Sequence, residues 1–341
     1  MEYDRSGSFY NYLPEGCRLC FKGAKMVLFV TGICGRNCFY CPVSYKRRGN
    51  AAAYANERLV GNDEDIIEEA ISMDALGASI TGGEPLLEIE RVLHYIRLLK
   101  NKFGEAFHIH LYTALSPGKE MLVLLKEAGL DEIRFHPPPD VWENIMKTPY
   151  RDSIIAAHEL GISTGIEIPS IKADLSGILT LLEEVDGFLN LNELEFSETN
   201  AQELGKRDYV PENDVSMAVH GSRDFAVLVN GKKLHFCSSV FKDAVQLRER
   251  FKRIAKRAAR DFDEITDDGT LIYGAIDGDS LLALKNAGVP VNMFEVKEGM
   301  IETSWWIASE MAEELKEIGC QVSIIERHPI KDGIIVERTP L

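Results

Sequence analysis

The sequence of 341 residues contains no apolar run of about 18 residues, the length that a helix needs to cross a bilayer. Its start also lacks the basic and apolar regions of a secretory signal peptide. We therefore expect a protein without membrane contact that works in the cytoplasm. Because a reducing cytoplasm disfavours disulfides, we interpret the seven cysteines as metal ligands or buried thiols.

Positive charge is scarce as well: 38 Lys and Arg stand against 54 Asp and Glu, a net charge of −16. Such an acidic chain is a poor general binder of nucleic acid, although a local basic face could still act. Material for a core is ample, since 45% of the residues are hydrophobic. The length suffices for one large domain and a smaller one.

Residues 26–42, MVLFVTGICGRNCFYCP, carry the most informative motif. A strand-like apolar run is followed by three cysteines with the spacing C-x3-C-x2-C, namely Cys34, Cys38 and Cys41. Iron–sulfur clusters are held by cysteine thiolates that such short spacings bring together on a loop. Three thiolates on a four-iron cluster would leave one iron free for another ligand.

A second pair, Cys17 and Cys20, permits a different interpretation. With Cys38 and Cys41 it gives C-x2-C-x17-C-x2-C, a spacing that zinc ribbons use. Such a protein would bind nucleic acid without catalysis. Cys34 is then left over and an apolar strand fills the interval, so the zinc ribbon is kept as the alternative.

The chain that follows alternates strands with amphipathic helices. Strands are expected at residues 26–30, 78–81, 107–113, 132–136, 162–168 and 188–196. This alternation predicts a parallel sheet with crossover helices. The six units fall short of the eight in a closed barrel, so the predicted fold is α/β with an open barrel.

The segment Gly82-Gly83-Glu84-Pro85 ends the second expected strand. Paired glycines there let the backbone approach a ligand closely. Together with the cysteine triplet, this segment resembles the radical S-adenosylmethionine (radical SAM) superfamily, most closely proteins related to the pyruvate formate-lyase activating enzyme. The resemblance covers about residues 26 to 197.

The resemblance implies a partial (β/α)6 TIM-like barrel and an enzyme with two cofactors, a [4Fe–4S] cluster on Cys34, Cys38 and Cys41 and S-adenosylmethionine (SAM). Reductive cleavage of SAM would give a 5′-deoxyadenosyl radical that abstracts hydrogen from a substrate. It implies that residues 82–85 bind the amino group of SAM and that the backbone of Tyr40 faces the adenine. It also implies an electron donor such as ferredoxin or flavodoxin.

Further cofactor contacts are expected at the C-terminal ends of the strands, where ligands sit in this class of sheet. His136 ends the fourth strand, and Glu167 points away from its apolar neighbours, where it could accept from ribose hydroxyls. Asn192 lies on the sixth strand, with Glu193 and Glu195 as comparable candidates. A structural histidine and a solvated strand edge are the ordinary alternatives.

Residues 1–25 are interpreted as an N-terminal extension with a metal clip at Cys17 and Cys20. Both cysteines lack a partner, and Cys237 follows a later strand. We hypothesise that these three hold a second cluster or a zinc ion, with His235 or Cys320 as a further ligand. For Cys320, core packing is the simpler explanation.

Residues 198–261 are predicted to hold a hairpin, with strands at 225–229 and 233–236 around Asn230-Gly231, and then an amphipathic helix. From Lys242 to Arg260 this helix carries eight Lys or Arg and two Asp or Glu. A solvated helix that pairs with an acidic surface is one interpretation, and a face for phosphates is the other.

Residues 262–341 are expected to form a small α/β domain. The resemblance to the radical SAM superfamily suggests two substrate types, a protein or peptide and a nucleic acid such as tRNA.

Overall fold

The computed structural model describes residues 1–330 and 333–341. These residues divide into two compact units, one of residues 1–71 and 75–246 and the other of residues 72–74 and 247–341. Each unit has its own sheet and its own buried core. None of the helices in the described ranges is long and apolar enough to span a membrane.

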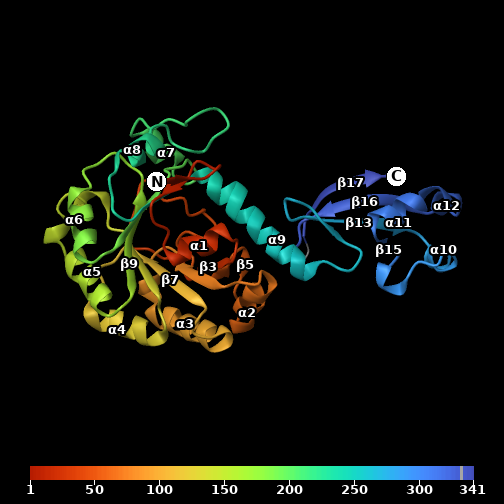
Figure 1. The fold of residues 1–341 in the computed structure, drawn as a ribbon, viewed down its shortest axis with the longest axis horizontal. Coiled ribbons are helices and arrows are strands. Elements are labelled where there is room, and N and C mark those ends of the chain that lie inside the picture. Colours follow the sequence, from red (N-terminus) through yellow and green to blue (C-terminus); the bar gives the residue numbers. More distant parts are fainter. Residues whose placement is uncertain (331–332) are drawn as a thin grey trace. The chain divides into compact units, whose positions relative to one another are not determined.

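The first unit is built on an eleven-stranded sheet, and helices cover its outer side (Figure 1). Seven of its strands run parallel, in the order β11-β10-β9-β8-β7-β6-β3. They are β3 (Lys25–Phe29), β6 (Gly77–Thr81), β7 (His108–Thr113), β8 (Glu132–Phe135), β9 (Ser163–Pro169), β10 (Phe188–Asn192) and β11 (Leu234–Cys237). The predicted fold class, a partial barrel of parallel strands with crossover helices, is confirmed.

Five crossover helices connect the parallel strands: α2 (Asp63–Ser72), α3 (Ile89–Phe103), α4 (Lys119–Ala128), α5 (Pro149–Glu159) and α6 (Ser176–Glu184). Each buries an apolar face, as α3 does with Val92, Ile96 and Leu99. Gly129 ends α4 in the left-handed conformation that glycine favours, and Pro149 opens α5 at its first position.

A short helix, α1 (Glu15–Phe21), lies on the inner side of the sheet and contacts β3, β6 and β7 (Figure 1). Leu19 approaches Gly77, the first residue of β6, so α1 sits at the N-terminal ends of the strands. A Cβ atom at Gly16 would lie 2.3 Å from Nδ1 of His110. Glycine is therefore needed where α1 meets β7.

Short antiparallel strands border the parallel sheet on both sides. β1 (Glu2–Tyr3) pairs with β2 (Phe9–Tyr10), which pairs with β11. At the other edge, β4 (Tyr54–Ala55) pairs with β3 and with β5 (Arg58–Leu59). Very short edge strands of this kind leave little open edge for another chain to pair with.

The predicted hairpin around Asn230-Gly231 is wrong. Residues 225–228 belong to helix α8 (Ser222–Leu228), and β11 pairs in parallel with β10 instead. A short apolar run fits a helix as well as a strand, and burial of β11 between β10 and β2 decides the pairing. Other short helices in this unit are α7 (Ala201–Gly205) and the one-turn segments Pro85–Glu88, Pro139–Val141 and Ile145–Lys147.

The predicted amphipathic helix after β11 begins as a π-helical segment, Phe241–Gln246, which belongs to the first unit. It continues as α9 (Leu247–Ala258) in the second unit. The unit boundary therefore falls inside the predicted helix.

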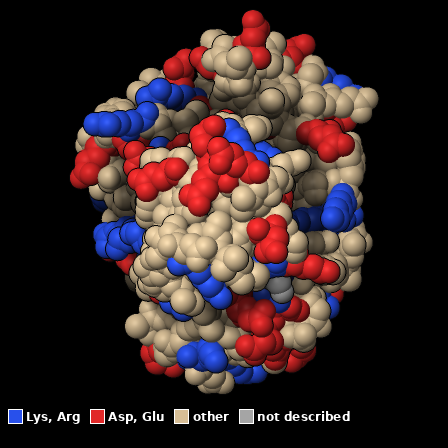
Figure 2. All heavy atoms as spheres, turned by 90° about the vertical axis from the view of Figure 1, so that its right-hand side faces the viewer, with Lys and Arg blue, Asp and Glu red and all other residues tan. Residues whose placement is uncertain are grey.

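The second unit holds an antiparallel sheet in the order β14-β15-β13-β16-β17, with β12 beside β13. The strands are β12 (Glu264–Ile265), β13 (Leu271–Asp277), β14 (Phe294–Lys297), β15 (Met300–Thr303), β16 (Gln321–Arg327) and β17 (Ile335–Pro340). The helices are α10 (Leu281–Asn286), the one-turn Val291–Met293, α11 (Trp305–Glu310) and α12 (Ala312–Glu317). Acidic and basic side chains are interspersed over the face that Figure 2 shows.

Cys320 is buried in the apolar core of this unit, beside Leu284, Leu315 and Val322. Its surroundings fit the packing role considered from the sequence.

Candidate cluster and cofactor site

The three cysteines of the first motif lie on a loop that leaves the end of β3. The loop returns on itself, because the N–H of Gly32 donates to the carbonyl of Asn50 at 2.7 Å. Cys34 is exposed, whereas Cys38 and Cys41 are half-buried. Burial raises the pKa of the Cys34 and Cys38 thiols. Metal binding at this loop must therefore release protons.

The glycine pair after β6 lies directly against this loop. The N–H of Gly83 donates to the carbonyl of Thr31 at 2.7 Å, and the N–H of Glu84 donates to that of Ile33 at 2.9 Å. A Cβ atom at Gly83 would lie 2.4 Å from the Ile33 oxygen and 2.9 Å from Cβ of Cys34. No side chain fits there, so glycine is required for the two segments to meet.

Glu84 holds the adjoining strand ends in place. Its side chain is 1% exposed. Oε1 accepts from the N–H of Leu86 at 3.0 Å and from Oγ1 of Thr113 at 2.8 Å, and Oε2 accepts from the N–H of Ala114 at 2.7 Å. Burial raises the pKa of Glu84 despite these donors. The carboxyl group thus joins the end of β6 to the end of β7, and Pro85 begins the next turn.

Tyr40, next to Cys41, is fixed at both ends. Its carbonyl accepts from Nδ2 of Asn200 at 3.0 Å, and its hydroxyl lies 2.9 Å from Nε2 of His136. Nδ1 of His136 lies 2.6 Å from the carbonyl of Glu167, which can only accept. Nδ1 therefore carries the proton and Nε2 accepts from Tyr40. Burial lowers the pKa of His136, in keeping with this neutral form.

Glu167 and Asn192, both predicted from strand ends, belong to one polar group in the barrel. Oε2 of Glu167 accepts from Nη1 of Arg134 at 2.6 Å and from Nδ2 of Asn190 at 2.9 Å. Oε1 accepts from Nδ2 of Asn192 at 2.8 Å. Burial alone would raise the pKa of Glu167, but the Arg134 charge and the amide donors outweigh it and lower the pKa to about 2. Glu167 is therefore ionised.

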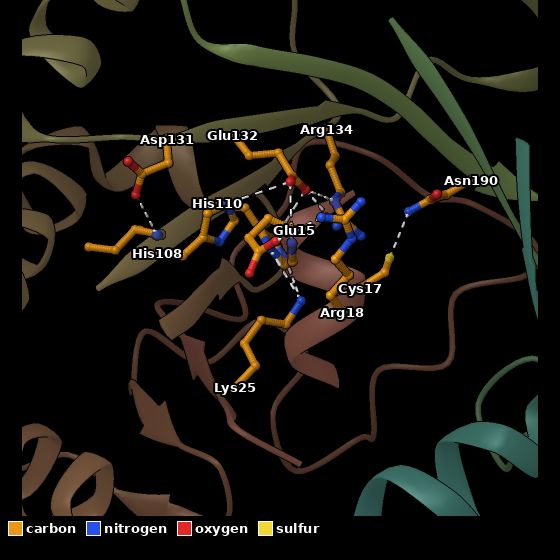
Figure 3. A network of polar contacts seen from close by, with 12 residues as sticks. Glu15, Cys17, Arg18, Lys25, His108, His110, Asp131, Glu132, Arg134 and Asn190 are labelled. Carbon is orange, nitrogen blue, oxygen red and sulfur yellow. Dashed lines mark hydrogen bonds and ion pairs between the residues drawn. The ribbon is translucent and has the colours of Figure 1, made fainter. Parts of the chain in front are cut away.

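Through Arg134, Glu167 is connected to a buried ionic network that the sequence analysis missed. Figure 3 shows Arg134 with Glu132, His110 and Lys25 of this network. Arg134 pairs with Glu132 at 2.5 Å, and Nζ of Lys25 lies 3.2 Å from Nε2 of His110. Burial, followed by the charges of Lys25 and Arg134, lowers the pKa of His110 well below its usual value. Polar residues that alternate with apolar ones along β7 and β8 were the available signal, since alternate residues face the same side of a strand.

A cavity of about 620 Å³ inside the first unit brings the predicted residues together. Those that line it are Cys17, Cys20, Cys34, Cys38, Tyr40, Cys41, Gly82, Gly83, Pro85, His136, Glu167, Asn192 and Cys237. Glu193, Glu195 and His235 also line the cavity. Glu84 does not line it but is hydrogen-bonded to Thr113 and Ala114, which do.

The donor set of the cysteine loop fits an iron–sulfur cluster. Within residues 1–330 and 333–341, no three His, Cys, Asp or Glu side chains converge as ligands of one metal ion would. In a cluster each thiolate binds a different iron, so such convergence is not needed. The close approach of Gly83 to Cys34 leaves backbone, not a side chain, beside this cysteine.

Comparison with known proteins agrees with this geometry. Residues 28–183 match the radical SAM superfamily, and residues 269–341 match a domain of unknown function, DUF8061. A protein of Methanocaldococcus jannaschii, described as "putative glycyl-radical enzyme activating enzyme", is 40% identical over 97% of this chain and 94% of its own length. The chain belongs to the radical SAM superfamily. It is an enzyme, and its similarity to the Methanocaldococcus relative is consistent with the resemblance to proteins related to the pyruvate formate-lyase activating enzyme.

Membership implies an iron–sulfur cluster and SAM as general properties of the radical SAM protein. The zinc-ribbon alternative is wrong, since Cys17 and Cys20 belong to helix α1 inside a barrel.

The crystal structure of methylornithine synthase aligns with 52% of this chain and 56% of its own, at 14% identity and a TM-score of 0.38. That similarity is too weak to carry a conclusion.

Proposed function

We propose that this radical SAM protein holds a [4Fe–4S] cluster on Cys34, Cys38 and Cys41 and binds SAM in the adjoining cavity. The contact of Gly83 with the cysteine loop carries the proposal, because it brings the backbone of the glycine pair beside Cys34. When bound, cluster and SAM supply one-electron cleavage to methionine and a 5′-deoxyadenosyl radical.

The protein's own part is to bind and orient. Gly82 and Gly83 offer backbone groups to the amino acid part of SAM, and Glu84 keeps them in place. Tyr40, held by His136, fixes the backbone beside the adenine. Glu167 and Asn192 offer polar groups to the ribose, and the charge on Glu167 is already balanced by Arg134.

We further propose that the substrate is a protein, as the description of the Methanocaldococcus relative suggests. Phe39, within the cysteine loop, stacks on Tyr209 with ring centroids 6.2 Å apart. The segment after Tyr209 exposes Val210 (55%), Val215 (91%) and Met217 (61%). Exposed apolar groups beside acidic Glu212 and Asp214 favour a protein over the phosphates of a nucleic acid.

The basic helix does not favour tRNA. Lys242 pairs with Glu195 at 3.0 Å, Lys252 with Glu249 at 3.2 Å and Arg253 with Asp74 at 2.6 Å. These cations already have acidic partners within the protein. The structure therefore favours the interpretation of a basic helix that pairs with acidic neighbours.

The electron donor is proposed to bind the exposed face of the cysteine loop. Lys46 and Arg48 are exposed just after the cysteines. Acidic donors such as ferredoxin or flavodoxin would be steered there by charge. Salt should then slow reduction by such a donor more than reduction by dithionite, a small anion that makes no extended contact with the protein.

Deuterium transfer tests the substrate proposal. Reduced enzyme with SAM is mixed with an extract of cells grown on glycine deuterated at Cα, separated into protein, RNA and small-molecule fractions. We expect deuterated 5′-deoxyadenosine with the protein fraction alone. Deuterium from the small-molecule fraction, or product formation stimulated only by RNA, would overturn the protein assignment.

A further inference from the structure

Three further cysteines line the cavity that contains the cysteine loop, namely Cys17 and Cys20 of α1 and Cys237 of β11. Cys17 and Cys20 lie one helical turn apart and so share a face of α1. Sγ of Cys17 accepts from Nδ2 of Asn190 at 3.3 Å, and Figure 3 shows these two side chains pointing toward each other. Sγ of Cys20 accepts from Nε2 of Gln246 at 3.5 Å. Cys237 ends β11 and lines the cavity with them.

His235 and Cys237 are two residues apart on β11 and therefore face the same side. The register of β10 and β11 pairs Asn190 with His235 and Asn192 with Cys237. Both asparagines donate to Glu167 inside the barrel. His235 thus belongs to the group of residues that surrounds the three thiols.

Two polar groups at this place lack any partner within the described ranges. His235 is 2% exposed, and neither of its ring nitrogens makes a hydrogen bond. Oδ1 of Asn190, which is 1% exposed, makes none either. Leaving a buried polar group without a partner is unfavourable, because the group has lost its hydrogen bonds to water. A ligand beside His235 would remove this cost.

We propose that Cys17, Cys20, Cys237 and His235 bind a second iron–sulfur cluster inside the barrel. Thiolates and imidazole are ligands that suit zinc and iron–sulfur clusters. A single zinc ion needs all ligands to converge, which they do not, whereas a cluster binds each ligand through a different iron. Phe21 and Phe241, whose rings lie 4.2 Å apart, also line the cavity and would shield the cluster from solvent.

Such a cluster would join α1 to β11, two segments that lie far apart in the sequence. The site shares the cavity with the cysteine loop but no ligand residue, and its occupancy does not depend on the proposed reaction. It can therefore be tested in protein that has lost the loop cysteines.

The experiment compares three variants of the full chain after anaerobic reconstitution with iron and sulfide. The loop variant carries Cys34→Ala, Cys38→Ala and Cys41→Ala, and the cavity variant carries Cys17→Ala, Cys20→Ala and Cys237→Ala. Cys320→Ala is the matched control, because Cys320 is buried in the other unit. Iron, sulfide and zinc are measured, and EPR spectra of reduced samples are recorded with and without SAM.

We expect the loop variant and the cavity variant each to keep about half of the wild-type iron. SAM should leave the EPR signal of the loop variant unchanged, since protein ligands fill every position, and should alter that of the cavity variant. Cys320→Ala should match wild type. His235→Ala in the loop variant should change its EPR signal.

A folded loop variant that binds no iron, or that binds zinc instead, would overturn the proposal. Wild-type iron in the cavity variant would do the same, and an unchanged signal after His235→Ala would remove that ligand. If the cavity variant does not fold, the loop variant decides alone, because it keeps every proposed ligand. Failure of SAM cleavage in wild type would count only against the proposed function.

Discussion

The hydroxyl of Tyr40 lies 2.9 Å from Nε2 of His136, and this hydrogen bond joins the cysteine loop to the barrel. Through Nδ1, His136 continues the link to the backbone of β9. The link from Tyr40 to the barrel therefore runs through a neutral histidine.

Tyr40→Phe removes this hydrogen bond and should lower the free energy of unfolding by about 1 kcal/mol. The freed loop should also release its iron faster. Both effects are measured on reconstituted protein, by urea unfolding and by the rate of iron transfer to a chelator. Tyr45→Phe is the control, because Tyr45 is exposed in the same region. Equal rates of iron release for the two variants would show that the link has no role in holding the loop.

Gly83→Ala should expel the cluster. The new methyl group would meet the Ile33 carbonyl at 2.4 Å, so the glycine segment and the cysteine loop must separate. Gly35→Ala lies in the same loop, where an added Cβ meets nothing within 4 Å. We expect near wild-type iron and SAM binding for Gly35→Ala and a large loss of both for Gly83→Ala. Wild-type iron content in Gly83→Ala would argue against the close packing described here.

Arg134→Met should destabilise the protein by roughly 3–5 kcal/mol, because it leaves the buried carboxylates of Glu132 and Glu167 without their cation. Arg151→Met removes an exposed pair with Glu184, whose effect should stay below about 1 kcal/mol. Thermal and urea unfolding of the two variants give the comparison. Similar losses in both would mean that the buried network contributes no more than a surface pair.

Stability should fall below about pH 6.5, the ordinary pKa of histidine. Burial, with Lys25 and Arg134 nearby, lowers the pKa of His110 in the folded protein, so the unfolded chain takes up a proton first. Neutral His110 contributes its full share of the free energy of unfolding above the pKa that histidine has in the unfolded chain. Below that pKa, this share declines by roughly 1 kcal/mol per pH unit. His110→Gln should reduce this slope in urea unfolding between pH 7 and pH 5. Exposed His158→Gln should not, and an equal slope in both would contradict the assignment.

Much of the fold followed from local pattern. The spacing of caps and apolar residues located the parallel strands, because each βα unit encodes its own boundaries. The site residues at strand ends, among them His136, Glu167 and Asn192, could be found because the C-terminal ends of parallel strands meet. The six predicted strands all lie in the observed sheet.

The rest depended on contacts between distant parts of the chain. Asn230-Gly231 carried a hairpin signal, but β11 is buried between β10 and β2, and this environment overrode it. Arg134 and Glu132 read as ordinary strand residues, because their partners come from α1, β7 and β9. The sequence of residues 15–21 does not indicate that α1 lies on the inner side of the sheet. The residues around Cys17 and Cys20 could therefore be identified only from the structure.

Formation of 5′-deoxyadenosine shows whether the three loop cysteines support cleavage of SAM. Anaerobically reconstituted protein is reduced with dithionite, given SAM and assayed for this product beside Cys38→Ala, with iron measured in both. We expect product from wild type and none from Cys38→Ala. Iron-loaded wild type that forms no product even with cell extract, or equal product from Cys38→Ala, would contradict this expectation.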